Sequence, residues 1–278
     1  MSRYRAMFDR LEQAGEGAFG AFVMLGDPDA ETGRAILDAL VEGGADMIEV
    51  GIPFSDPIAD GPVIQAAADR ALAAGTTPAR CFTVLAEFRA RHPQVPVGIL
   101  TYANLVLARG RDAFYAAAAE AGVDSVLVAD VPVFEAPPFA EAARAHGIAP
   151  VLIAAQNTPE PALRRVAKLG EGYTYCLARA GVTGAGETVA FDHREMLGTL
   201  RQNLAPPPVF GFGISKPEHV AAALAAGAAG AISGSAIVAL AEANRADPAP
   251  ALRTFAAAMK AATRAPSAAT VRGSPPGS

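Results

Sequence analysis

The sequence predicts an α/β protein that folds as a single (β/α)8 TIM barrel with an extra N-terminal helix and additional short helices. Eight short apolar segments alternate with helical ones, which is the pattern of parallel strands joined by helical crossovers. The length of 278 residues suits one barrel, which typically needs roughly 250. An open doubly wound sheet uses the same repeating unit, but eight units and late glycine turns favour closure.

The predicted elements follow one another along the whole chain. The strands are short apolar runs at 21–25, 46–51, 97–102, 125–130, 150–154, 173–177, 209–212 and 230–232. An amphipathic helix near 4–13 precedes them, and further helices are predicted near 29–42, 63–74, 78–91, 112–121, 139–145 and 250–262. Gly147 marks a helix stop. Ser215 and Glu218 have the spacing of a capping box, which predicts a helix start after the seventh strand.

One catalytic domain, residues 1–262, and a tail, residues 263–278, are predicted. The tail loses the helical periodicity and collects Pro, Gly, Ser and Thr, so we expect it to be disordered. Residues 220–241 contain no charged side chain and are long enough to span a bilayer. Their small alanines, punctuated by glycine and serine, instead predict a helix, a short strand and another helix start.

Charge and cysteine content argue against several classes of function. The chain has 23 basic and 28 acidic residues, a net charge of −5, whereas nucleic-acid and membrane-surface binders carry basic patches. Cys81 and Cys176 lie far apart and predict a reduced, cytoplasmic protein. The N-terminus lacks the apolar run of a signal peptide. We expect no metal site, and surface positions for the four histidines, at 92, 146, 193 and 219.

The strand at 46–51 carries a single acid on a mostly apolar face. Ile48 and Val50 share one face, and Met47 and Glu49 share the other, because side chains alternate along a strand. Such a strand is expected to be buried on both sides. Burial raises the pKa of a carboxyl group toward neutrality, which suits a general acid or base. The alternative is a structural acid held by backbone amides.

Two further acids, Asp56 and Asp60, follow in a loop that Pro53, Pro57 and Pro62 stiffen. A turn-forming role is the alternative for both aspartates.

Glycine-bearing turns after the last three strands predict a phosphate site. Gly213 and the pair Gly234-Ser235 lie at strand-to-helix junctions, where backbone amides and the helix dipole attract anions. A longer loop, residues 180–186, could close over a ligand. Each turn alone is also explained by backbone geometry. Lys216 either contacts the phosphate or is a solvated helix charge.

Several strand residues near the same end form either core or an apolar slot for a flat ring. Tyr173 and Tyr175 share one face of their strand, and Tyr175 is nearer the loop end, so it is the better site candidate. The other lining candidates are Phe22, Leu100, Tyr102, Leu127, Ala129, Ile153, Phe212 and Ile232.

The segment Glu-Val-Gly-Ile-Pro-Phe-Ser-Asp-Pro-Ile-Ala-Asp-Gly-Pro, residues 49–62, resembles the signature of the tryptophan synthase alpha chain family. The likeness extends over about 8–243 and includes Leu-Gly-Asp-Pro at 25–28, Tyr-Thr-Tyr at 173–175, Arg-Ala-Gly-Val-Thr-Gly at 179–184, Gly-Phe-Gly-Ile-Ser at 211–215 and Gly-Ser-Ala at 234–236. It implies reverse aldol cleavage of indole-3-glycerol phosphate to indole and glyceraldehyde 3-phosphate, without a cofactor in this chain.

The resemblance also implies roles for individual residues. Glu49 would shuttle protons, Asp60 would accept the indole N–H, and Tyr175 would position the substrate. Thr183 joins the substrate-binding set on the same ground. The phosphate would be held by backbone amides of Gly184, Gly213, Gly234 and Ser235.

A beta chain carrying pyridoxal phosphate is the implied partner, in an alpha2beta2 tetramer. The residues that match the family's contact loops are Pro53, Asp56, Asn104, Asp130 and Pro132. Leu105 and the pair Val133-Phe134 depart from the family pattern and leave the details of the interface open. The alternatives are a stand-alone lyase that releases free indole and a catalytically silent barrel that binds a phosphate ligand.

Overall fold

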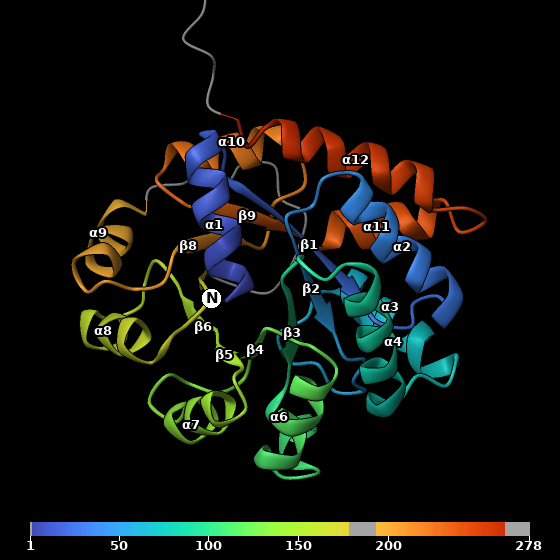
Figure 1. The fold of residues 1–278 in the computed structure, drawn as a ribbon, viewed down its shortest axis with the longest axis horizontal. Coiled ribbons are helices and arrows are strands. Elements are labelled where there is room, and N and C mark those ends of the chain that lie inside the picture. Colours follow the sequence, from blue (N-terminus) through green and yellow to red (C-terminus); the bar gives the residue numbers. More distant parts are fainter. Residues whose placement is uncertain (1, 178–192, 265–278) are drawn as a thin grey trace, which may run out of the picture.

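The computed structural model describes residues 2–177 and 193–264 (Figure 1). The strands of this part of the chain are β1 Ala18–Met24, β2 Met47–Gly51, β3 Val97–Thr101, β4 Ser125–Val128, β5 Ala149–Pro150, β6 Leu152–Ala154, β7 Thr174–Leu177, β8 Pro208–Gly211 and β9 Gly230–Ser233. They form one sheet in the order β5-β4-β3-β2-β1-β9-β8-β7-β6. Every neighbouring pair within it is parallel.

The sheet closes through Val151. Its two end strands, β5 and β6, are halves of the single strand predicted at 150–154, and Val151 between them donates its N–H to the Val126 carbonyl at 3.0 Å. The strand is divided at Val151, because its first half pairs with β4 and its second half pairs with β7. The strands follow chain order around the ring, which confirms the barrel. A doubly wound sheet would reverse its strand order.

A ring of helices surrounds the strands (Figure 1). The helices are α1 Arg3–Ala14, α2 Ala30–Glu42, α3 Pro62–Ala73, α4 Pro78–Arg91, α5 Ala103–Leu107, α6 Arg111–Glu120, α7 Pro137–Ala145, α8 Glu160–Leu169, α9 Arg194–Gln202, α10 Pro217–Ala225, α11 Ser235–Ala243 and α12 Ala249–Ala261. Sequence reasoning did not place α5, α8 or α9. The first has five residues, and each of the others buries only three apolar side chains on an otherwise polar helix.

The predicted capping box at the start of α10 is wrong. The N-cap residue is Lys216, whose side chain makes no capping hydrogen bond. Ser215 instead donates its backbone N–H to Nδ1 of His219 at 3.2 Å. The chain turns into the helix one residue later than the spacing suggested, because Pro217 takes the first helical position, where its missing N–H costs nothing.

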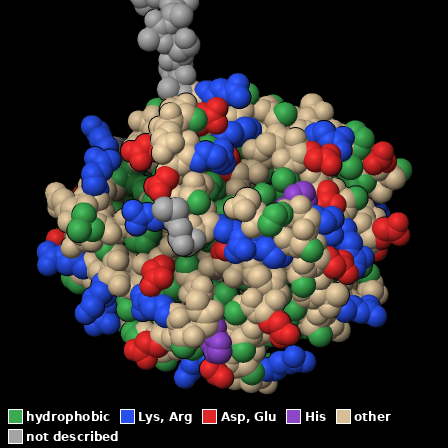
Figure 2. Space-filling view, viewed as in Figure 1, with side chains coloured by type: hydrophobic (Ala, Val, Ile, Leu, Met, Phe, Trp, Pro, Cys, Tyr) green, Lys and Arg blue, Asp and Glu red, His purple; other side chains and the backbone are tan. Residues whose placement is uncertain are grey.

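Helix α1 covers the amino-terminal opening of the barrel, the face seen in Figure 1. The Tyr4 hydroxyl lies 2.8 Å from Oγ of Ser125, the first residue of β4. Arg3 forms an ion pair with Asp124 at 2.8 Å. The opposite, carboxyl-terminal opening is therefore the end at which a ligand can enter, as in other barrels. On the α1 face, basic and acidic side chains are interspersed (Figure 2).

The core has two layers. Ile48 and Val50 belong to the layer between the strands and the helices, and Met47 belongs to the layer inside the barrel. All five residues of β2 are buried. The predicted alternation is thus confirmed, and Glu49 points into the barrel with Met47.

Residues 220–241 form the end of α10, strand β9 and most of α11, as predicted. Within the described ranges, no helix is long and apolar enough to cross a membrane. At the C-terminal end, Thr263 is buried and Arg264 forms an ion pair with Glu16 at 3.0 Å. The remainder of the predicted tail, 265–278, lies outside the described residues.

Gly198→Ala is expected to raise the free energy of unfolding by about 0.5–1 kcal/mol, because alanine restricts the unfolded chain more than glycine does. Gly198 lies inside α9, and a Cβ atom there meets nothing within 4 Å. Urea denaturation measures the change. The matched control is Gly147→Ala, where space is equally open but φ is +72°; it should destabilise the protein by about 1 kcal/mol. A destabilised Gly198→Ala variant would contradict the expectation.

Candidate active site

Glu49 lies inside the barrel with only 1% of its surface exposed. The Tyr173 hydroxyl donates a 2.6 Å hydrogen bond to Oε1, and Oε2 has no hydrogen-bond partner among the described residues. Burial raises the pKa of the carboxyl group to about 7, and the Tyr173 hydrogen bond opposes part of that rise. Because the carboxyl group accepts its hydrogen bond from a side chain and not from the backbone, this geometry favours a proton-transfer group over a structural acid held by backbone amides.

Tyr173 is a site residue that sequence reasoning placed on the correct face but ranked below Tyr175. Its ring contacts Tyr4 of α1, with centroids 5.3 Å apart, and Tyr175, with centroids 6.5 Å apart. The sequence feature that indicated Tyr173 was its alternation with Tyr175, which places both side chains on one face of the strand. The cross-barrel distance to Glu49 was not available from the sequence, because 124 residues separate the two.

Asp60 is held at the end of the loop that joins β2 to α3. Burial raises the pKa of its carboxyl group, and a hydrogen bond with Tyr102 lowers it. The Ala59 N–H donates to the same Tyr102 hydroxyl at 3.3 Å, and the Phe54 ring packs on the Tyr102 ring with centroids 5.6 Å apart. Gln65 of α3 donates its side-chain amide to the Asp60 carbonyl at 2.7 Å. Asp60 is therefore anchored through both its side chain and its backbone.

The predicted lining residues, with one exception, gather in the inner layer of the barrel. Tyr175 packs edge-on against Phe212 with centroids 5.8 Å apart. Tyr102 is buried but outside this cluster, beside Asp60. We call the following set the apolar slot: Phe22, Leu100, Leu127, Ala129, Ile153, Tyr175, Phe212 and Ile232.

Two consecutive residues after β8 have left-handed backbones. Phe212 has φ +64° and Gly213 has φ +78°. Glycine adopts this conformation freely, whereas a phenylalanine there is strained, and such strain is concentrated at functional sites. The left-handed turn presents the Phe212 ring to Tyr175 while the chain turns toward α10.

The predicted phosphate turns lie at the carboxyl ends of adjacent strands. Gly213 follows β8, and Gly234 is the N-cap of α11, which begins at Ser235. No side chain caps the first turn of α10 or α11, so the uncapped amides and the helix dipoles suit an anion. Thr183 and Gly184, in the predicted closing loop, lie outside the described residues.

The loops after β2, β3 and β4 present the predicted partner residues. Asp56, Asn104 and Pro132 are exposed, Asp130 is half-buried, and Pro53 is buried. Asp130 accepts the Ala103 N–H at 2.8 Å, which ties the loop after β4 to α5.

Neither cysteines nor histidines supply a second centre in the described chain. Burial raises the pKa of each thiol, Cys81 and Cys176, to about 12, so both are inert. Across the described ranges, no group of His, Cys, Asp and Glu could hold a metal ion. The surface position predicted for His193 is wrong. It is 2% exposed and packs on Phe210 with ring centroids 4.8 Å apart.

A family model described as tryptophan synthase alpha chain matches residues 8–265. The chain belongs to the tryptophan synthase alpha chain family. It is 57% identical to the tryptophan synthase alpha chain of Shewanella oneidensis over 94% of this chain and 95% of the relative. It is 55% identical to that of Klebsiella pneumoniae over 95% and 99% of the two chains.

Solved structures of tryptophan synthase show the same fold. That of Mycobacterium tuberculosis matches with a TM-score of 0.86 and 29% identity over 95% of this chain and 99% of that one. A chain of the alpha2beta2 complex from Pyrococcus furiosus matches with a TM-score of 0.81 and 37% identity over 88% and 98%. These matches confirm the predicted barrel and the predicted carbon–carbon lyase of the tryptophan synthase alpha family.

Proposed function

We propose that the chain cleaves indole-3-glycerol phosphate with Glu49 as the proton shuttle and Asp60 as the group that stabilises the charged indole ring. The observation that carries this assignment is the buried Glu49 carboxyl, whose pKa is raised to about 7 beside the apolar slot. A carboxyl group with that pKa can both give and take a proton near neutral pH.

The reaction requires two proton transfers around one bond. Protonated Glu49 gives its proton to C3 of the indole ring, which leaves the ring nitrogen positively charged. The Glu49 carboxylate then takes the proton of the hydroxyl group on the carbon attached to C3. The carbon–carbon bond breaks, its electrons return to the ring, and the products are indole and glyceraldehyde 3-phosphate, with Glu49 again protonated.

Asp60 and the phosphate turns hold the two ends of the substrate. The Asp60 carboxylate accepts the indole N–H and stabilises the positive charge on the ring, a preorganised electrostatic role that its anchoring by Tyr102 and Gln65 supports. The amides of Gly213, Gly234 and Ser235 hold the phosphate, together with Gly184 outside the described ranges. Binding energy from the phosphate fixes the reacting carbon near Glu49, while Thr183 and the apolar slot position the substrate.

Incubation of the purified chain with indole-3-glycerol phosphate tests the proposal. Release of indole and glyceraldehyde 3-phosphate is expected from the chain alone, and faster release when a tryptophan synthase beta chain is added. A rate that the beta chain leaves unchanged would favour the stand-alone lyase. No release under either condition would favour a silent barrel and contradict the proposal.

Tyr173→Phe is expected to move the alkaline limb of the pH–rate profile to higher pH. Glu49 must start protonated, so kcat/KM should fall as the pH rises through about 7. The Tyr173 hydrogen bond lowers the pKa of Glu49, and its removal therefore raises that pKa. Profiles of the two proteins with the same substrate measure the difference. A limb that stays in place or moves to lower pH would contradict the assigned starting state.

The partner is a tryptophan synthase beta chain, which holds the pyridoxal phosphate of the family. We place its contact surface on the loops after β2, β3 and β4, with Pro53, Asp56, Asn104, Asp130 and Pro132. Three large apolar side chains on these loops and on α5 are exposed, namely Ile58, Leu107 and Phe134. Apolar exposure of this kind is typical of protein interfaces.

Phe134→Ala is expected to raise the beta-chain concentration needed for half-maximal activation at least tenfold. The reason is that exposed aromatic anchors supply much of an interface's binding energy. Phe134 is 54% exposed, and the Arg165 guanidinium lies over its ring at 4.7 Å, which holds the ring in place. Titration of the beta chain against indole release measures the effect. Leu204→Ala is the control, since Leu204 is 89% exposed but precedes β8 at the other end of the barrel. Equal titrations for the two variants would exclude an anchoring role.

The domain boundaries and the location of the protein in the cell are also proposals. We place the site in one domain that was predicted to end at residue 262 and extends to Arg264, because Thr263 is buried and Arg264 is paired with Glu16; residues 265–278 follow it as the proposed tail. A cytoplasmic location agrees with two buried, unpaired thiols and is tested by cell fractionation.

A further inference from the structure

A cluster of one arginine and two acids links the two sides of the site. Asp27 lies in the loop after β1 and its side chain is 9% exposed. Arg70 of α3 binds it bidentately, with Nε to Oδ1 at 2.7 Å and Nη2 to Oδ2 at 2.8 Å. Nε of Arg70 also lies 3.3 Å from Oε2 of Glu242 on α11.

The two helices in this cluster each begin at a functional end of the substrate site. Helix α3 starts two residues after Asp60, and its Gln65 holds the Asp60 carbonyl at 2.7 Å. Helix α11 starts at Ser235, directly after the Gly234 turn. The relative position of α3 and α11 therefore sets the distance between the indole-binding acid and the phosphate-binding turn.

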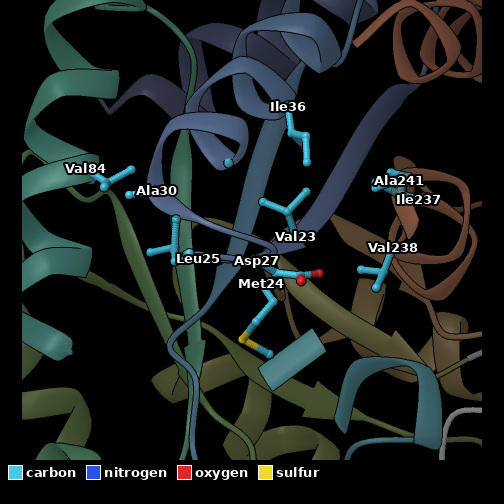
Figure 3. Close-up of a pocket in the computed structure, with 12 residues that line it drawn as sticks. Val23, Met24, Leu25, Asp27, Ala30, Ile36, Val84, Ile237, Val238 and Ala241 are labelled. Carbon is cyan, nitrogen blue, oxygen red and sulfur yellow. The ribbon is translucent and has the colours of Figure 1, made fainter. Parts of the chain in front are cut away.

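Apolar packing alone fixes that position weakly. The buried face of α3 consists of Ile64 and three alanines, Ala67, Ala68 and Ala71, and it belongs to the same inner cluster as Val238 of α11. Alanines form shallow ridges, which oppose sliding less than large interlocking side chains do. A cavity of about 20 Å³ lies between the end of β1, α2 and α11. Figure 3 shows the Asp27 carboxylate pointing from the end of β1 toward α11, beside this cavity.

We propose that Arg70 is a positioning residue that, through Asp27 and Glu242, fixes Asp60 at the correct distance from the phosphate-binding start of α11. The proposal rests on the roles proposed above for Asp60 and Ser235. A bidentate arginine–carboxylate pair has directional geometry that apolar contacts lack, and a shift of about 1 Å in a reacting group can cost about a hundredfold in rate.

Arg70→Met tests this role through ligands that occupy one end or both ends of the site. We expect kcat/KM for indole-3-glycerol phosphate, which spans both ends, to fall about ten- to a hundredfold. Affinities for inorganic phosphate and for indole, which each occupy one end, should change less than twofold. Arg70→Lys, which keeps the charge but not the fork, should lie between wild type and Arg70→Met.

Arg34→Met is the matched control. Arg34 also binds a carboxylate bidentately, that of Glu87, and joins α2 to α4 away from the site. It should leave kcat/KM within twofold while lowering the melting temperature comparably. If Arg70→Met does not fold, Asp27→Asn should show the same split to a smaller degree.

An unchanged kcat/KM in Arg70→Met would overturn the positioning role. So would a fall in kcat/KM for indole-3-glycerol phosphate that is matched by equal falls in the affinities for inorganic phosphate and for indole. Failure of the wild-type chain to cleave the substrate would instead contradict the proposed function.

Discussion

Glu49→Gln is expected to lower kcat about 10²–10⁴-fold, the usual contribution of a general acid–base group, while indole-3-glycerol phosphate still binds. Glutamine has nearly the same shape as glutamate but cannot transfer a proton at C3 or at the hydroxyl group. Single-turnover release of indole measures the loss, and calorimetry measures binding. Turnover at the wild-type rate would reject the assigned role.

The same variant should be more stable than wild type at alkaline pH. The Glu49 carboxyl has a pKa of about 7 in the folded chain, whereas the ordinary pKa of a glutamate is 4.5. The folded state therefore holds an extra proton between these values, and wild-type stability falls as the pH rises through that window. By pH 8 the wild-type protein has lost about 3 kcal/mol of its free energy of unfolding in this way. Glu49→Gln has no ionisable group at this position and keeps that stability. Denaturation of both proteins at pH 5 and pH 8 measures this change. It also shows whether the inactive variant is still folded.

Asp60→Asn should lower kcat about 10²–10³-fold, the cost of removing one preorganised electrostatic group from a transition state. Asparagine can still accept the indole N–H, so the affinity for indole should change little, whereas the charge that stabilises the positive ring is gone. Steady-state kinetics with indole-3-glycerol phosphate test the split between kcat and KM.

Asp69→Asn serves as the control for this variant, because Asp69 is exposed and lies in the second half of α3, away from the loop. It should behave as wild type. A loss confined to KM in Asp60→Asn would mean that Asp60 binds the substrate without stabilising the transition state.

Much of this site followed from local patterns. Alternation along β2 placed Glu49 on the same buried face as Met47, and the glycine turns at 213 and 234 indicated adjacent strand ends. These features depend on neighbouring residues, whose geometry is regular.

Features that depend on contacts between distant segments were missed. The hydrogen bond from Tyr173 to Glu49 crosses the barrel. The burial of His193 depends on its packing against Phe210, and the division of the fifth strand depends on how Val151 bonds to the strand beside it. The cluster of Arg70 with Asp27 and Glu242 joins three segments, and none of the three residues is distinctive in its own segment.

A crystal structure of the Glu49→Gln variant with indole-3-glycerol phosphate would show directly whether Glu49 and Asp60 meet the substrate as proposed. We expect the phosphate on the amides of Gly213, Gly234 and Ser235, the indole N–H on Asp60, and C3 within hydrogen-bond reach of residue 49. A phosphate bound at the opening that α1 covers, or a ring bound away from residue 49, would contradict this expectation.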